Sequence, residues 1–270
     1  MTQAGKIHIG VGGWTFEPWR GAFYPQGLRQ KDELAYMAAR LTAIEINATY
    51  YGSQKPASFA SWAAQVPDGF VFSVKGSRFC TNRRALKEGA ESIDRFMRQG
   101  ISELGDKLGP ILWQFAPTKK FDPDDFQDFL DLLPAKLEGL PLRHCVEVRN
   151  ETFCTPEFPA LLRKHGVALV YADHGTYPEI ADVTAPFVYG RLQTGSDDIA
   201  TAYGPADLDL WAGRLKTWAQ GGEPADLPKA DMGHVAATTP REVFAFIIHE
   251  GKVRAPAGAM ALIERTGGRD

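Results

Sequence analysis

The five residues AIEIN, at positions 43–47, alternate between apolar and polar side chains. Successive side chains of a β-strand point to opposite faces. Ile44 and Ile46 therefore share one face of a predicted strand, and Glu45 and Asn47 share the other. A strand with one apolar and one charged face needs two different environments, one on each side.

Two further segments repeat this arrangement. In FVFSVK, residues 70–75, Lys75 falls on the polar face, and in HCVEVR, residues 144–149, Glu147 and Arg149 do the same. In a barrel that is covered by helices, the apolar faces of the strands must point outward to meet those helices. The charged side chains are therefore expected to point into the barrel.

Eight such segments alternate with helical patterns, which favours parallel strands joined by βαβ units. We predict an α/β fold, a TIM-barrel-like (β/α)8 barrel; a doubly wound open sheet is the competing layout. Chain length suits the barrel, and no phosphate-loop signature supports the open sheet. The strands are predicted to begin at Ile7, Ala43, Phe70, Ile111, His144, Val167, Phe187 and Val243. Helices are predicted at 30–41, 88–108, 123–133, 156–164, 205–219 and 256–264.

The predicted repeat is imperfect in one place. Only 20 positions separate Val167 from Phe187, so the helix between strands six and seven is expected to be short or missing. Residues 221–240 show no periodicity and are expected to form a loop over one end of the barrel. No linker interrupts the chain, so we predict a single domain over residues 1–270.

Polar side chains gather late in the strands, where the active sites of such barrels lie. The candidate general acids or bases are Glu45, Glu147 and Asp173. The candidate ligand-binding residues are Asn47, Lys75, Gln114, Arg149, Arg191 and His249, with Trp14 and Tyr51 as aromatic walls from the loops after the first two strands. The competing interpretation is a structural ion-pair network, because buried charges must be paired whatever the function.

Composition excludes several function classes. A formal net charge of −3 disfavours nucleic acid as a partner. No apolar run is long enough for a membrane helix, and the first residues lack a signal-peptide pattern, so a cytoplasmic protein is expected. Three cysteines are too few for a disulfide framework, and the inward cations would repel a metal ion. We therefore predict no metal and no cofactor; the oligomeric state is left open.

Three functions remain open. The first is binding or conversion of a small polar or anionic molecule by hydrolase-like or isomerase-like acid–base chemistry, because arginine and lysine suit carboxylate or phosphate groups. The second is a metal-dependent phosphodiesterase or nuclease-like barrel. The third is a non-catalytic sensor that reuses the barrel pocket.

The chain also resembles a known family. The motifs that carry the resemblance are IHIGVGGWTFEPWRGAFYP, AIEINATYYG, FVFSVKGSRFCT, LGPILWQFAP, CVEVRNETF, ALVYAD, FVYGRLQTG and KVRAPAGAMAL, in order from Ile7 to Leu262. They are similar to those of the YecE-like family, a domain of unknown function. The resemblance implies a TIM-barrel-like fold and a soluble chain without a cofactor. The chain departs from the family pattern at its eighth strand, where FIIHEGK places His249 and Glu250.

Overall fold

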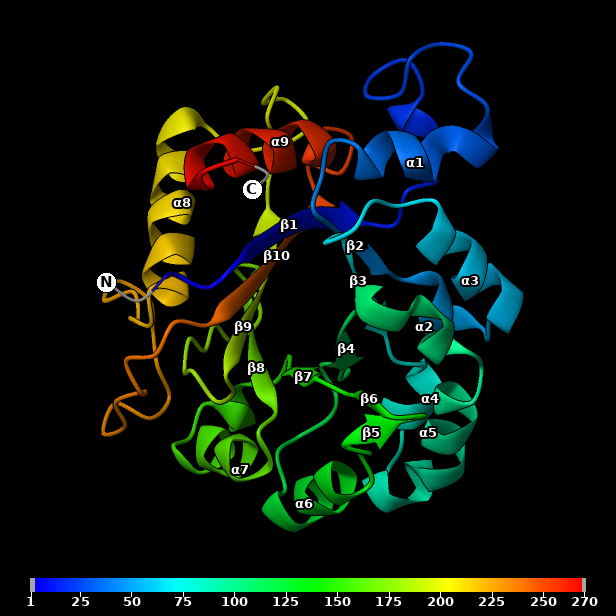
Figure 1. The fold of residues 1–270 in the computed structure, drawn as a ribbon. Coiled ribbons are helices and arrows are strands. Elements are labelled where there is room, and N and C mark those ends of the chain that lie inside the picture. Colours follow the sequence, from blue (N-terminus) through cyan, green and yellow to red (C-terminus); the bar gives the residue numbers. More distant parts are fainter. Residues whose placement is uncertain (1–2, 269–270) are drawn as a thin grey trace.

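The computed structural model describes residues 3–268, except for the side chain of His249. Eight parallel strands form a closed barrel in the order β1-β10-β9-β8-β7-β4-β3-β2 (Figure 1). They are β1 Ile7–Gly12, β2 Ala43–Ile46, β3 Val71–Lys75, β4 Leu108–Gln114, β7 His144–Glu147, β8 Ala168–Asp173, β9 Phe187–Thr194 and β10 Glu242–Glu250. Each strand begins within three residues of its predicted start. The prediction of a TIM-barrel-like fold is confirmed.

Helices surround these strands (Figure 1). They are α1 Glu33–Ala38, α2 Ala48–Tyr51, α3 Pro56–Ala64, α4 Arg78–Thr81, α5 Ala90–Met97, α6 Pro123–Asp131, α7 Glu157–His165, α8 Pro205–Ala219 and α9 Ala255–Thr266. Short 3-10 helices occupy Glu17–Trp19, Gln30–Asp32, Leu86–Gly89, Ile101–Lys107 and Glu151–Phe153, and a small hairpin pairs β5 Lys136–Leu137 with β6 Leu140–Pro141. Among the described residues, no helix has the length and hydropathy to cross a membrane.

Two helical regions differ from the prediction. Helix α3, PASFASWAA, is not predicted by the apolar spacing, because Phe59 is its one fully buried side chain and small residues dilute the pattern. The helix predicted over residues 88–108 is divided into shorter pieces. Gly100 has φ 105° and Gly105 has φ 53°, both in the left-handed region that a continuous α-helix cannot contain.

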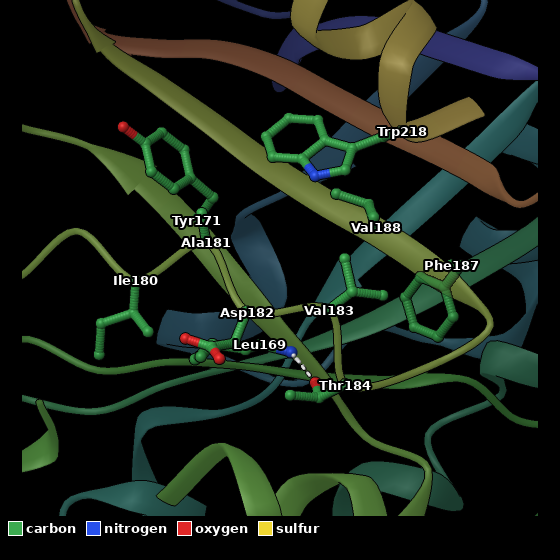
Figure 2. Close-up of a pocket in the computed structure, with 10 residues that line it drawn as sticks. All are labelled: Leu169, Tyr171, Ile180, Ala181, Asp182, Val183, Thr184, Phe187, Val188 and Trp218. Carbon is green, nitrogen blue, oxygen red and sulfur yellow. Dashed lines mark hydrogen bonds between the residues drawn. The ribbon is translucent and has the colours of Figure 1, made fainter. Parts of the chain in front are cut away.

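The connection from β8 to β9, residues 174–186, contains no helix, as predicted from its length. This segment instead covers the outside of the barrel itself, and Ile180 packs into the outer apolar core (Figure 2). The hydroxyl of Thr184 accepts a hydrogen bond from the Leu169 amide and donates one to the Val167 carbonyl, both at 2.7 Å. The side chain thus satisfies backbone groups at the start of β8.

Residues 220–241 connect α8 to β10 without helix or strand. Because they lead into the start of β10, they lie at the N-terminal end of the strands. Pro228 accepts a hydrogen bond from the Ala181 amide at 2.8 Å, and Asp182 accepts one from the Ala230 amide at 2.7 Å. This long loop is thereby joined to the β8–β9 connection, at the end of the barrel away from the predicted site.

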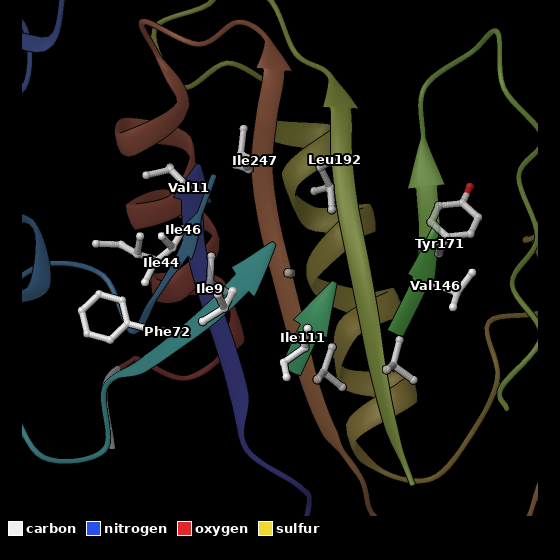
Figure 3. Close-up of a cluster of buried hydrophobic side chains, with 14 of the residues drawn as sticks. Ile9, Val11, Ile44, Ile46, Phe72, Ile111, Val146, Tyr171, Leu192 and Ile247 are labelled. Atoms are coloured by element: carbon white, nitrogen blue, oxygen red, sulfur yellow. The ribbon is translucent and has the colours of Figure 1, made fainter. Parts of the chain in front are cut away.

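The barrel strands separate two apolar layers. Ile44, Ile46 and Val146 belong to the outer layer, between strands and helices (Figure 3). The inner layer fills the barrel and contains Ala43, Val71, Leu112, Cys145, Ala168, Val170, Phe187, Tyr189, Phe244, Phe246 and Ile248. Glu45 lies two positions after Ala43 in β2, and Glu147 lies two positions after Cys145 in β7, so both glutamates are on the inward faces of their strands. The sequence prediction that the charged faces point inward is thus consistent with the partition of the core.

Candidate functional site

A polar layer closes the inside of the barrel above the apolar one. It is built by the inward faces of β2, β3, β4, β7 and β9 near their C-terminal ends. Backbone pairing aligns Glu45 with Ser73 and Gln114 with Glu147. Because parallel strands of a barrel run in one direction, these C-terminal positions meet at one mouth.

Arg191 of β9 lies between the two carboxylates of this layer. Its Nε and Nη2 donate to Glu45 Oε2 and Oε1 at 3.1 and 3.0 Å, the two-pronged pairing that suits a guanidinium and a carboxylate. Its Nη1 donates to Glu147 Oε2. Both glutamates are 0% exposed. One buried guanidinium therefore holds Glu45 and Glu147 together across the barrel.

Further donors complete the shell around the carboxylates. Glu147 Oε1 accepts hydrogen bonds from Arg149 Nε at 2.7 Å and from Gln114 Nε2 at 2.8 Å. Glu45 Oε2 accepts a hydrogen bond from the Tyr189 hydroxyl at 2.7 Å. Each of the four carboxylate oxygens thus has at least one donor, which is what buried carboxylates require.

These contacts keep both glutamates ionised. Burial alone raises the pKa of Glu45, but the charges of Arg191 and Lys75 outweigh it and hold that pKa below its ordinary value. Burial likewise raises the pKa of Glu147, and the charges of Arg191 and Arg149 overcome it, lowering the pKa to about 2. Both groups therefore carry no proton at neutral pH and are weak bases.

Lys75, the last residue of β3, has a different environment. The side chain is 7% exposed, and Nζ lies 4.4 Å from the centre of the Tyr50 ring, a cation–π contact. Within the part of the chain that the structure describes, Nζ makes no hydrogen bond or ion pair. Burial first, and then the charge of Arg191, lower the pKa of Lys75 to about 8. Lys75 is therefore a nearly buried amine that has no hydrogen-bonding partner among the described residues.

The charges of the polar layer do not cancel. Arg149, Arg191 and Lys75 are three cations, and Glu45 and Glu147 are two carboxylates. The described residues of the layer therefore carry an excess of one positive charge. Because an unbalanced charge in a low-dielectric site is unfavourable, this arrangement favours the arrival of an anion.

Three polar residues of this layer were not among the predicted site residues. Tyr189 contacts Glu45, and Ser73 shares a 2.8 Å hydrogen bond with the Tyr189 hydroxyl. Gln193 is 2% exposed, and its Nε2 is a buried donor without a hydrogen-bond partner. Alternation along FVYGRLQT places Tyr189 and Gln193 on the face of Arg191, so the sequence contained the signal for both.

Asn47 lies just beyond β2 at the same mouth. Its Nδ2 donates to the Glu45 carbonyl at 3.4 Å. A Cβ atom on Gly12 would come within 2.9 Å of that nitrogen, so the glycine leaves the space that the asparagine side chain occupies. Asn47 is half-buried and contributes an amide at the edge of the charged layer.

The expectation that Asp173 points into the barrel is wrong. Tyr171, two residues earlier on the same face of β8, packs against Trp211 and Trp218 of the outer helix α8. Asp173 lies on the same outward face of β8 as Tyr171, and its Oδ2 accepts a hydrogen bond from the Thr194 hydroxyl at 2.6 Å. The alternation in VALVYAD places Asp173 with the apolar outward side chains, and its position at a strand end does not override that alternation.

The expectation that Trp14 lines the mouth is also wrong. Its ring packs edge-to-face against Trp62 of α3, with centroids 5.0 Å apart, and against Phe72 on the outer face of β3. The chain turns outward after β1, so this loop joins the helical layer.

Two other predicted residues at the mouth are Tyr51 and His249. Tyr51 is 67% exposed, and the ring that contacts Lys75 is that of its neighbour Tyr50. The predicted ligand residue His249 has its side chain outside the described part of the structure.

A loop residue lies against the outer edge of the layer. The guanidinium of Arg149 lies 4.7 Å from the ring centre of Tyr177, which belongs to the β8–β9 connection. Nη1 and Nη2 of Arg149 make no hydrogen bond to any described residue.

Metal ligands are a separate question. Among the described residues, no group of three or more His, Cys, Asp or Glu side chains is arranged to hold a metal ion. The geometry therefore offers free cationic donors rather than metal ligands.

Comparison with known proteins finds one matching family and several relatives of low sequence identity. Residues 8–270 match the family described as "Protein of unknown function DUF72". The UPF0759 protein YunF of Bacillus subtilis is 23% identical over 157 residues, which span 56% of this chain and 54% of YunF. A DUF72 family protein from Thermotoga maritima is 21% identical, with a TM-score of 0.69 over 95% of this chain and 96% of that one. A D-psicose 3-epimerase crystallised with D-fructose shares the fold at 11% identity and a TM-score of 0.52, over 97% of this chain and all of that one.

Proposed function

The chain belongs to the DUF72 family of unknown function, and we propose that its barrel mouth binds a small anionic molecule and converts it by acid–base chemistry. The observation that carries this proposal is the excess positive charge of the polar layer, with Lys75 nearly buried and without a hydrogen-bonding partner among the described residues. A carboxylate or phosphate group between Lys75 and Arg149 would neutralise that excess. Arg149 offers its two free Nη groups for two-pronged binding.

The residues of the site divide into two roles under this proposal. Glu45 and Glu147 hold Arg191 and Arg149 in place, because every carboxylate oxygen accepts a hydrogen bond and both groups stay charged. Lys75 exchanges the proton, because a group with a pKa of about 8 can both accept and release one near neutral pH. Lys75 therefore replaces the glutamates as our candidate acid or base.

Two further inferences concern the whole chain. We propose that residues 1–270 form a single domain, supported by a family match that runs from residue 8 to 270 through one closed barrel. We also infer that DUF72 and the YecE-like family are one family. Both cover nearly the whole chain, and neither has an assigned reaction.

A binding measurement tests the proposed function. Isothermal titration calorimetry compares D-fructose with D-fructose 6-phosphate, a neutral and an anionic form of one sugar; D-fructose is the sugar in the epimerase crystal. We expect the phosphate ester to bind at least about tenfold more tightly, because a charge-assisted contact contributes about 1.5–3 kcal/mol. Inorganic phosphate serves as the smallest anionic probe.

Two variants place that binding at the mouth. Lys75→Met should remove the preference for the anion, and Lys120→Met, at an exposed lysine, should leave it unchanged. Affinity for the phosphate ester should fall as the pH rises through about 8, because Lys75 then loses its charge. Equal binding of the two sugar forms, or equal effects of the two variants, would contradict the proposal.

A further inference from the structure

The amine of Lys75 combines two properties that rarely occur together. Lys75 is only 7% exposed, and its Nζ has no hydrogen-bond partner among the described residues. Unlike Gln193 Nε2, however, Nζ is not fully sealed from solvent. Among the described residues, no carboxylate lies within ion-pair distance of Nζ, because Arg191 and Arg149 occupy both glutamates of the layer. The structure thus keeps a reachable amine free of the partner that would hold it protonated.

Cationic neighbours favour the neutral form of this amine. Arg191 and Arg149 both lower the pKa of Lys75, in addition to the larger effect of burial. The resulting value of about 8 lies well below the ordinary 10.5. At pH 7.5 the neutral fraction is then roughly two hundred times that of an exposed lysine. Desolvation beside another cation is a known way to make a lysine nucleophilic.

We propose that Lys75 is a nucleophile that forms an imine with the carbonyl carbon of a small anionic aldehyde or ketone, such as a 2-oxo acid. This inference rests on the proposed function and narrows its substrate class. Arg149, with two free Nη groups, would bind the carboxylate of such a molecule. The uncharged ring of Tyr50, from helix α2, lies beside the reacting nitrogen.

The step balances without any further reactant. The Lys75 ammonium first releases one proton to solvent. Neutral Nζ then attacks the carbonyl carbon, a C–N bond forms as the C=O π bond breaks, and one proton moves from nitrogen to oxygen to give a neutral carbinolamine. The hydroxyl group takes up the proton released at the start, the C–O bond breaks, and water leaves. Overall, the lysine ammonium and the carbonyl compound give a protonated imine and one water molecule, so charge and atoms are conserved. The positive imine remains close to Glu45 and Glu147, whose charges affect Lys75 directly.

Reductive trapping tests this inference on the purified protein. The protein is incubated with pyruvate and sodium cyanoborohydride, which delivers hydride to an imine and leaves a stable secondary amine. Intact-protein and peptide mass spectrometry then locate the product. We expect one adduct at Lys75, formed at least about tenfold faster than at any other lysine. The rate should rise with pH through about 8 as Lys75 loses its proton.

Matched probes and variants make the outcome specific. Acetone has the carbonyl but no charge, so it should label Lys75 far more slowly than pyruvate does. Lys75→Arg keeps the charge but removes the nucleophile, and it should abolish the adduct while still binding lactate, which lacks the carbonyl. Lys120→Arg should leave labelling unchanged. Uniform labelling of many lysines, or an undiminished adduct in Lys75→Arg, would overturn the inference.

Lactate also separates this inference from the proposed function. If lactate or pyruvate binds at the mouth but pyruvate gives no adduct at Lys75, the imine is refuted and the anion site stands. If neither these acids nor the sugar phosphate binds, the proposed function fails as well. Circular dichroism of each variant confirms that it is folded.

Discussion

Replacing Glu147 by glutamine removes one charge from the polar layer and keeps the shape of the side chain. In the native protein this carboxylate is fully buried and accepts hydrogen bonds from Arg191, Arg149 and Gln114. The glutamine amide can accept at one oxygen and must place an NH2 group against a guanidinium. The layer would then hold three cations against Glu45 alone.

Two independent arguments give the size of the effect. Removing one partner of a buried ion pair costs about 3–5 kcal/mol, because the remaining charge is left uncompensated. The lowering of the Glu147 pKa from 4.5 to about 2 corresponds to about 3 kcal/mol of stabilisation of the charged form. We therefore expect Glu147→Gln to lower the free energy of unfolding by about 3–5 kcal/mol. For a chain of this size that is a fall in Tm of about 10 °C.

Urea unfolding and a thermal melt at pH 7 measure this loss. The matched control is Glu91→Gln, the same chemical change at an exposed glutamate that pairs with Arg95 on α5. Such a surface pair contributes about 0–1 kcal/mol, so the control should remain close to the wild type. Both variants lose one carboxylate charge, but only Glu147 is buried. The difference between their unfolding free energies therefore measures the effect of burial.

The pH dependence provides a second readout. Because the folded pKa of Glu147 is about 2 and its ordinary value is 4.5, its stabilisation is complete above about pH 4.5 and disappears as the pH falls toward 2. The stability gap between wild type and Glu147→Gln should therefore close over that range. A variant within about 0.5 kcal/mol of the wild type at pH 7, or a gap that does not change with pH, would refute the reasoning.

Three further substitutions test other parts of the structure. Asp173→Asn should leave the affinity for the sugar phosphate within about twofold, because this side chain points away from the barrel; a loss of binding would reinstate it as a site residue. Gln193→Leu should cost less than about 1 kcal/mol in urea unfolding, since the amide nitrogen has no partner to lose, yet weaken ligand binding; a large loss of stability would indicate a structural amide. Thr184→Val should lower stability by about 1–3 kcal/mol, because the Leu169 amide and Val167 carbonyl lose their partner; an unchanged urea midpoint would contradict this.

Apolar and polar alternation, together with the number of strands and the chain length, predicted the barrel and the inward-pointing charges of β2, β3 and β7. A strand with Ile44 and Ile46 on one face has to present that face to helices, and this leaves Glu45 inside. The spacing of the strands also predicted that the helix between β8 and β9 would be short or missing, and the connection contains none. These features depend on local periodicity and chain length, which can be read along a single chain.

The partners of each charge depend on strands far apart in the sequence. Arg191 lies 146 positions from Glu45 and 44 from Glu147, and only barrel closure brings the three together. The same closure leaves Lys75 beside two arginines and without an ion-paired carboxylate among the described residues, and this is why we propose the lysine, not the glutamates, as the acid or base. The charged residues near the strand ends can be counted in the sequence, but the sequence does not show which of them contact one another in the closed barrel. The outward turn of Trp14 onto α3 was likewise decided by packing, since an aromatic loop residue has equal reason to line a pocket or to join the core.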